Sequence, residues 1–97
     1  MNASRITAGG LPFGLAARQR RMVSELLLRK LAHHGYPETA IHFDTDLTKH
    51  HDHGAISYQL TFTTVSQPRT YTATAIKAGK QWRVELAKDG QTPELLR

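Results

Sequence analysis

The sequence contains no cysteine, and it contains no long apolar run. Without cysteine there are no disulfides, thiolate metal sites, iron–sulfur clusters or cysteine nucleophiles. The longest aliphatic run is Leu26-Leu27-Leu28, which is far too short for a membrane span or for the apolar region of a signal peptide. We therefore expect a cytoplasmic protein that needs no cofactor and has no membrane partner.

The sequence signatures of common catalytic sites are also missing. There is no nucleophile elbow, phosphate loop, dinucleotide-binding glycine pattern or HExxH motif. Asp44 and Asp46 would serve as paired carboxylates and His42 as a base, but any polar strand offers as much. We identify no family motif, and we expect a protein that binds rather than catalyses.

A chain of 97 residues is long enough for one small domain with a thin core. Glycines and prolines in residues 9–14 interrupt any regular element, so we predict a flexible tail over residues 1–14. The remaining residues, 15–97, are predicted to form a single α+β domain.

The main helix is predicted over residues 15–34. Apolar side chains recur there at helical spacing on one broad face, namely Leu15, Met22, Val23, Leu26, Leu27 and Leu31. Two histidines in the last turn, then Gly35 and Pro37, are typical of a helix end.

Four antiparallel strands are predicted to follow, over residues 41–47, 55–65, 70–78 and 81–86, with a polar loop at 48–54. A short helical turn is expected near Thr92. The Gly79-Lys80 turn places Ala75 opposite Val84, and a four-residue turn at 66–69 places Phe62 opposite Ala73 and Leu60 opposite Ala75. The expected fold is thus one N-terminal helix packed on one face of a four-stranded meander.

The net charge of +5 lies entirely within residues 1–37. Arg18, Arg21 and Arg29 share a helix face with Glu25, and Arg20 and Lys30 lie nearby. Arginine suits phosphate and carboxylate groups because its planar fork donates two hydrogen bonds at once. The simpler interpretation is a solvated helix face, since charge runs on helices are common.

Histidines and carboxylates gather in residues 42–53. His42, Asp44, His50, His51 and His53 are of the types that bind zinc, nickel or copper. Their spacing matches no specific zinc motif, so we favour a plain polar loop and no metal.

Three functions remain open from the sequence. The leading hypothesis is a binding module whose basic helix contacts nucleic acid or an acidic protein surface. The alternative is a protein-interaction or self-associating module, such as a homodimer, that uses a sheet edge or the exposed sheet face, where Ile76 lies beside Arg83. The third is a metal- or pH-responsive protein that uses the histidines. Steep salt dependence would distinguish the first from the second, and metal titration would identify the third.

Overall fold

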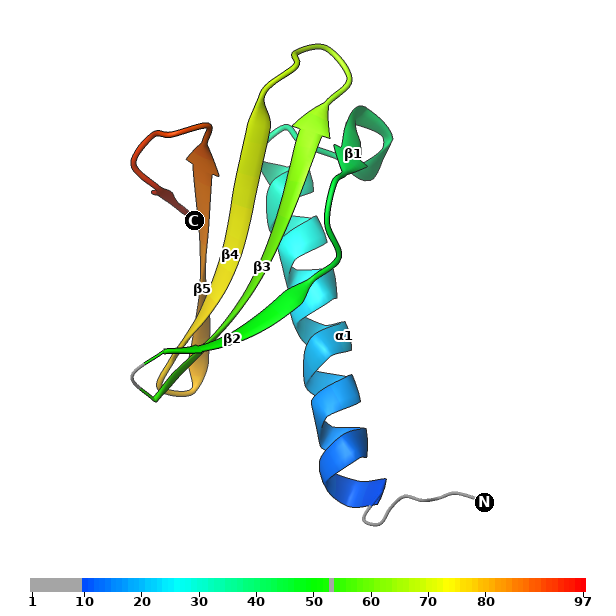
Figure 1. Cartoon of the computed structure of the whole chain (residues 1–97), viewed down its shortest axis with the longest axis vertical. Helices are drawn as coiled ribbons and strands as arrows, with labels where there is room; N and C mark the ends of the chain where they lie inside the picture. The colour runs from blue at the N-terminus through cyan, green and yellow to red at the C-terminus, as the bar shows by residue number, and fades with distance from the viewer. Residues whose placement is uncertain (1–9, 53) are drawn as a thin grey trace.

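The computed structural model describes residues 10–52 and 54–97, without the side chains of residues 10–13 and 52. Within these ranges the chain forms one α-helix, one short 3-10 helix and a six-stranded antiparallel sheet (Figure 1). The α+β class is therefore confirmed, with two more strands than the sequence predicted. Residues 1–9, most of the predicted tail, and His53 lie outside the described residues.

Helix α1 (Gly10–His33) begins five residues before its predicted start and ends one residue before its predicted end. Its end is built as expected, because Gly35 has a φ of 95°. The amide of Tyr36 donates to the carbonyl of Leu31 at 2.7 Å, and the amide of Gly35 donates to that of Ala32 at 3.2 Å. These two bonds satisfy carbonyls that the last helical turn leaves free.

The sheet is formed by β1 (Ile41–Phe43), β2 (Thr48–Asp52), β3 (Ala55–Thr64), β4 (Thr70–Ala78), β5 (Gln81–Lys88) and β6 (Glu94–Leu96). Their order is β1-β3-β4-β5-β6, and β2 pairs with β3 on the same side as β1. The 3-10 helix η2 (Glu38–Ala40) leads from α1 into β1.

The register of the β4–β5 hairpin is as predicted, with Ala75 opposite Val84. The β3–β4 register was wrong by two residues, because Leu60 lies opposite Ala73 and Tyr58 opposite Ala75. The turn is wider than expected: the hydroxyl of Thr64 donates to the carbonyl of Gln67 at 2.9 Å and accepts its amide at 3.1 Å. A slip of two residues leaves every side chain on its predicted face.

The prediction of one strand over residues 41–47 followed by a polar loop was wrong. The first strand ends at Phe43, because the amides of Asp44 and Thr45 both turn to the carbonyl of Thr61, at 2.8 and 3.4 Å. After this irregular segment the chain pairs with β3 again as β2, with Lys49 opposite Tyr58. Residues 48–52 of the expected loop therefore extend the sheet.

The expected helical turn near Thr92 is also absent from the described chain, where β6 pairs with residues 84–86 of β5. Leu96, opposite Val84, is 7% exposed and covers the edge of the core. Burial of this leucine against the sheet explains why an extended segment forms despite the helix-start signal of Thr92 and Pro93. Part of the fourth predicted strand, β5, is therefore covered by β6, and the rest remains a sheet edge in the described chain.

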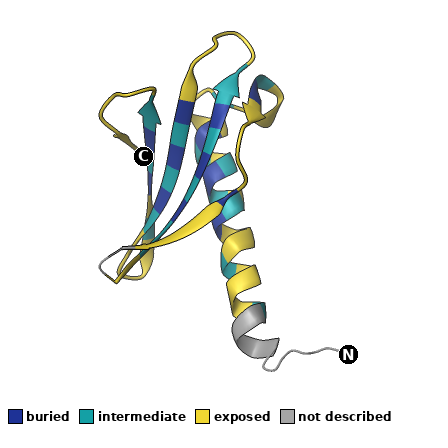
Figure 2. Ribbon diagram, viewed as in Figure 1, coloured by how far each residue is buried: buried dark blue, intermediate teal, exposed yellow. Residues whose placement is uncertain are grey.

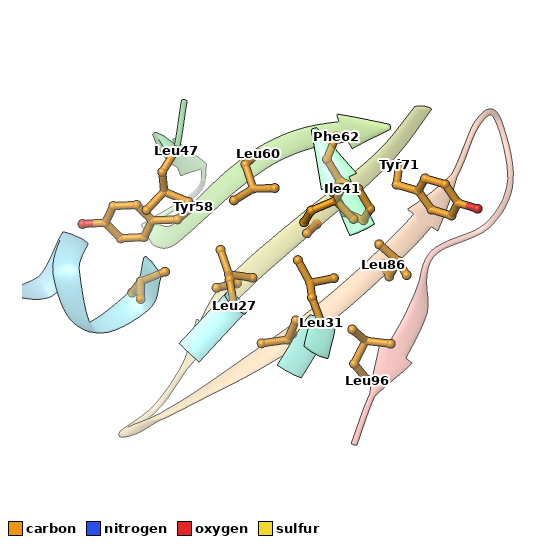
Figure 3. Close-up of a cluster of buried hydrophobic side chains, with 14 residues drawn as sticks. Leu27, Leu31, Ile41, Leu47, Tyr58, Leu60, Phe62, Tyr71, Leu86 and Leu96 are labelled. Atoms are coloured by element: carbon orange, nitrogen blue, oxygen red, sulfur yellow. The ribbon is translucent and has the colours of Figure 1, made fainter. Parts of the chain in front are cut away.

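The core lies between α1 and one face of the sheet (Figure 3). Val23, Leu27 and Leu31, spaced four residues apart, are fully buried on the helix. The helix approaches β4 most closely, where Ala73 and Ala75 are fully buried and small enough to admit it. The opposite face of the sheet carries mainly threonine and other polar side chains, which alternate along the strands with the buried ones.

Candidate binding surface on the projecting helix

The N-terminal half of α1 extends past the buried part of the sheet (Figure 2). Its buried positions begin at Val23, whereas most residues from 14 to 22 are exposed. We call residues 14–22 the projecting segment. Leu15 is 63% exposed and Met22 is 46% exposed. The apolar face of the helix that the sequence predicted therefore continues beyond the part of the helix that packs on the sheet.

Arg18, Arg21 and Arg29 are exposed on the side of α1 that faces away from the core. No ion pair joins them to Glu25 in the described part of the chain, where the one pair within 4 Å is Arg83–Glu85 at 3.3 Å. The arginine charges are therefore not neutralised by a close carboxylate and are open to an anionic partner.

The other two predicted residues do not share this face. Arg20 donates a hydrogen bond from its guanidinium to the carbonyl of Leu47, which ties the projecting segment to the connection between β1 and β2. Lys30 lies on the opposite flank, in a hollow that Arg83 and Arg97 also line. The five basic residues are thus spread around the helix, and Arg18, Arg21 and Arg29 share its exposed side with Glu25.

A groove that the sequence did not reveal lies between the projecting segment and the β4–β5 hairpin. Leu15, Arg18 and Met22 form its helix side, and Lys77, Lys80 and Trp82 form its hairpin side. Its volume is about 730 Å³. Trp82 packs against the core, with its ring centre 5.8 Å from that of Tyr58, and it also lines the groove.

One hydrogen bond ties the projecting segment to β3 beside this groove. The hydroxyl of Tyr58, which is 1% exposed, donates to Oε1 of Gln19 at 2.8 Å. On the other flank, Nζ of Lys49 lies 5.8 Å from the centre of the Tyr58 ring. A cation at this distance from an aromatic ring is attracted to its face. Tyr58 thus anchors the helix on the sheet just where the groove opens.

The histidines and carboxylates that the sequence singled out are not brought together. His42 is opposite Thr63 and His50 is opposite Ser57, so they lie six positions apart along β3, or roughly 20 Å. His50 and His51 are successive residues of β2 and point to opposite faces. Within residues 10–52 and 54–97 no group of three or more metal-ligating side chains is found. His53 lies outside these ranges.

Burial raises the pKa of the Tyr36 hydroxyl above its ordinary value of 10.0. The neighbouring Tyr71, through its charge and a hydrogen bond, and the charge of Glu94 act in the same direction. Tyr36 stacks at an angle against Tyr71 and Phe62 at the far end of the core, so this shift reflects packing rather than a site on the helix.

No family model, curated protein or solved structure matches the chain. Among the described residues, no helix combines the length and the apolar character needed to cross a membrane.

Proposed function

We propose that the protein is a small, non-enzymatic binding module that contacts an acidic protein surface through α1. The observation that carries this proposal is the mixed character of the projecting segment. Arg18 and Arg21 are exposed there beside Leu15 and Met22, which are the most exposed large apolar residues of the described part of the helix.

The apolar side chains favour a protein over a nucleic acid. Protein interfaces combine an apolar centre with arginine, and a few aromatic, methionine or arginine side chains supply much of the affinity. Phosphate backbones pair with the cations but leave Leu15 and Met22 in contact with water or with sugar edges. The described open face of the sheet carries threonines at the positions where RNA-binding sheets place stacking aromatics.

Binding to labelled probes tests this proposal. We suggest fluorescence anisotropy with a labelled peptide rich in Asp, Glu and Leu, and with short duplex and single-stranded oligonucleotides, at about 50 to about 300 mM salt. The acidic peptide should bind more tightly than either oligonucleotide, and its affinity should fall as salt rises.

The triple variant Arg18→Ala/Arg21→Ala/Arg29→Ala should weaken the peptide complex. Exposed ion pairs contribute about 0.2–1 kcal/mol each, so three lost pairs weaken binding roughly 3- to 150-fold. Arg69→Ala is the control, because Arg69 is equally exposed but lies in the β3–β4 loop, at the other end of the sheet (Figure 1). Tighter binding to the duplex would favour the nucleic-acid function instead, and equal binding by the triple variant would contradict the proposal.

Self-association is the second candidate, and the uneven cover of β5 favours it. β6 pairs only with residues 84–86, so Gln81, Trp82 and Arg83 have no strand beside them on that side in the described chain. Backbone groups at such an edge can pair with a second chain. Sedimentation velocity over a wide concentration range tests this directly: a dimer whose population rises with concentration would support it, and a monomer at the highest concentration would rule it out.

A further inference from the structure

The groove between the projecting segment and the β4–β5 hairpin combines three cations with an apolar surface. Arg18 contributes a charge from the helix, and Lys77 and Lys80 contribute charges from the hairpin. None of the described residues that line the groove is acidic. Glu85, the nearest acid on the hairpin's second strand, is held by Arg83 at 3.3 Å. The groove therefore has an uncompensated positive charge.

The apolar part of the groove is formed by Leu15, Met22 and Trp82. Leu15 and Met22 are exposed, and Trp82 is only partly buried. The flexible methionine adapts to a partner side chain of irregular shape, and the large indole ring offers it a broad apolar surface. The aliphatic stems of the two lysines extend this apolar surface while their ammonium groups stay in water.

The groove is also held open by contacts that do not depend on a ligand. The hydrogen bond between Tyr58 and Gln19 fixes the helix side, and the positive φ of 65° at Gly79 fixes the tight turn that carries Lys80. On the other flank, Arg20 holds the same part of the helix to Leu47. A preformed groove loses less conformational freedom on binding than a flexible one.

We infer that this groove binds a segment of a partner protein in which Asp or Glu residues flank one or two large apolar side chains. The inference rests on the proposed function and names the chemistry of its partner. Carboxylates of the segment pair with Arg18, Lys77 and Lys80, and the apolar side chain lies against Trp82 between Leu15 and Met22. The groove is wide open to solvent, so it admits one leucine or phenylalanine side chain without rearrangement of its walls.

Charge complementarity and the apolar surface select this occupant together. A nucleic-acid strand would pair with the three cations but gains little from Leu15 and Met22, which are not flat stacking surfaces. An uncharged apolar segment would bury Trp82 but leave Arg18, Lys77 and Lys80 beside an interface with no counter-charge. Only a segment that carries both carboxylates and a large apolar side chain can pair with the three cations and also cover Leu15, Met22 and Trp82.

Trp82 makes the test direct, because it is the only tryptophan in the sequence. The probe is a synthetic peptide, Glu-Asp-Glu-Leu-Leu-Glu-Asp-Glu, blocked at both ends and free of aromatic residues. One control peptide replaces the acids by glutamine, and the other replaces the leucines by alanine. We expect the probe to shift the Trp82 emission to shorter wavelength with a saturable curve, and each control peptide to bind at least tenfold more weakly.

The matched variants are Lys77→Gln/Lys80→Gln in the groove and Arg69→Gln/Lys88→Gln at the other end of the sheet. Both remove two positive charges. We expect the first to weaken the probe about tenfold and the second to leave its affinity unchanged, while circular dichroism shows both folded. Equal affinity in all three proteins, or a probe that binds without changing Trp82 emission, would overturn the inference.

Arg21→Ala/Arg29→Ala separates this inference from the proposed function, because neither arginine lines the groove. Suppose that this variant no longer binds the probe, that the probe does not change the Trp82 emission, and that the lysine variant binds with normal affinity. The helix face then binds acidic partners, and the groove inference fails. If Trp82 responds and only the lysine variant loses affinity, the groove inference holds and the arginine face is not the contact surface. If the probe does not bind at all, both fail.

Discussion

Three leucines on α1 differ in burial and provide a graded test of how the helix is held on the sheet. Leu27 is fully buried, Leu28 is partly buried, and Leu15 is 63% exposed. Leu27→Ala removes a buried side chain and leaves a cavity, which costs about 2–5 kcal/mol in the free energy of unfolding. A domain of this length has about 5–15 kcal/mol in total, so this one change removes a large share of the stability.

The other two substitutions should cost progressively less. Leu28→Ala removes about half of a burial contribution, or about 1 kcal/mol. Leu15→Ala should stay within about 0.5 kcal/mol of the wild type, because its side chain already contacts water. In a thermal melt the Leu27 variant should unfold roughly 8–40 °C lower than the wild type.

Urea titration followed by circular dichroism measures all three variants under the same conditions. The slope of the free energy against urea should be unchanged, because the same surface is exposed on unfolding. If Leu15→Ala destabilised the protein as much as Leu27→Ala, the projecting segment would be packed rather than exposed, and the binding surface proposed on it would not exist.

Three further outcomes follow from individual contacts. A double-mutant cycle on Tyr58→Phe and Gln19→Ala should give a coupling of about 0.5–1.5 kcal/mol in urea titrations, and no coupling would show that the hydrogen bond does not hold the helix. Gly35→Ala should destabilise the protein by about 1–2 kcal/mol because of its positive φ. Gly14→Ala, within the helix and with open space around its Cα, should instead stabilise it by about 0.5–1 kcal/mol; melts that reversed this order would contradict the assigned helix end. Finally, because burial raises the pKa of Tyr36, the folded state keeps the phenolic proton that the unfolded state loses above about pH 10. The contribution of Tyr36 to the free energy of unfolding should therefore be constant below that pH and fall above it. The loss of stability above about pH 10 should be smaller in Tyr36→Phe, and identical profiles from urea titrations above that pH would exclude the effect.

Local signals in the sequence were sufficient to predict the ends of those helices and strands that depend on a single residue type. Gly35 determines the end of α1, and the Gly79-Lys80 turn determines the β4–β5 register, because each needs a backbone conformation that glycine adopts easily. The β3–β4 turn depends instead on a bond between Thr64 and Gln67, which turn statistics do not reveal. The predicted β3–β4 register therefore placed each side chain on the correct face of the sheet but was shifted by two residues.

The two strands that were not predicted from the sequence form because they pair with residues that are distant in the sequence. β2 is polar and rich in histidine, and it is a strand because β3 offers it a partner, as at Lys49 and Tyr58. β6 forms because Leu96 covers the edge of the core beside Val84. Local composition favoured a loop and a helical turn at these two places, and tertiary pairing outweighed both preferences.

The candidate site was predictable only on its helix side. Helical spacing alone places Arg18, Arg21 and Arg29 on one exposed face. The groove needed the structure, since Lys77, Lys80 and Trp82 come close to the helix only through the length and twist of the β4–β5 hairpin. The one available signal was that Leu15 and Met22 extend the apolar stripe of α1 beyond the length of sheet that covers it.

Amide chemical shifts recorded during titration with the acidic leucine peptide test the central claim most directly, because they report on every part of the surface at once. We expect the largest changes at residues 14–22 of α1 and 77–82 of the hairpin, and little change at the threonines of the open face. Changes centred on the open face or on β2, with the projecting segment unaffected, would contradict the claim that the exposed half of α1 is where this protein binds its partner.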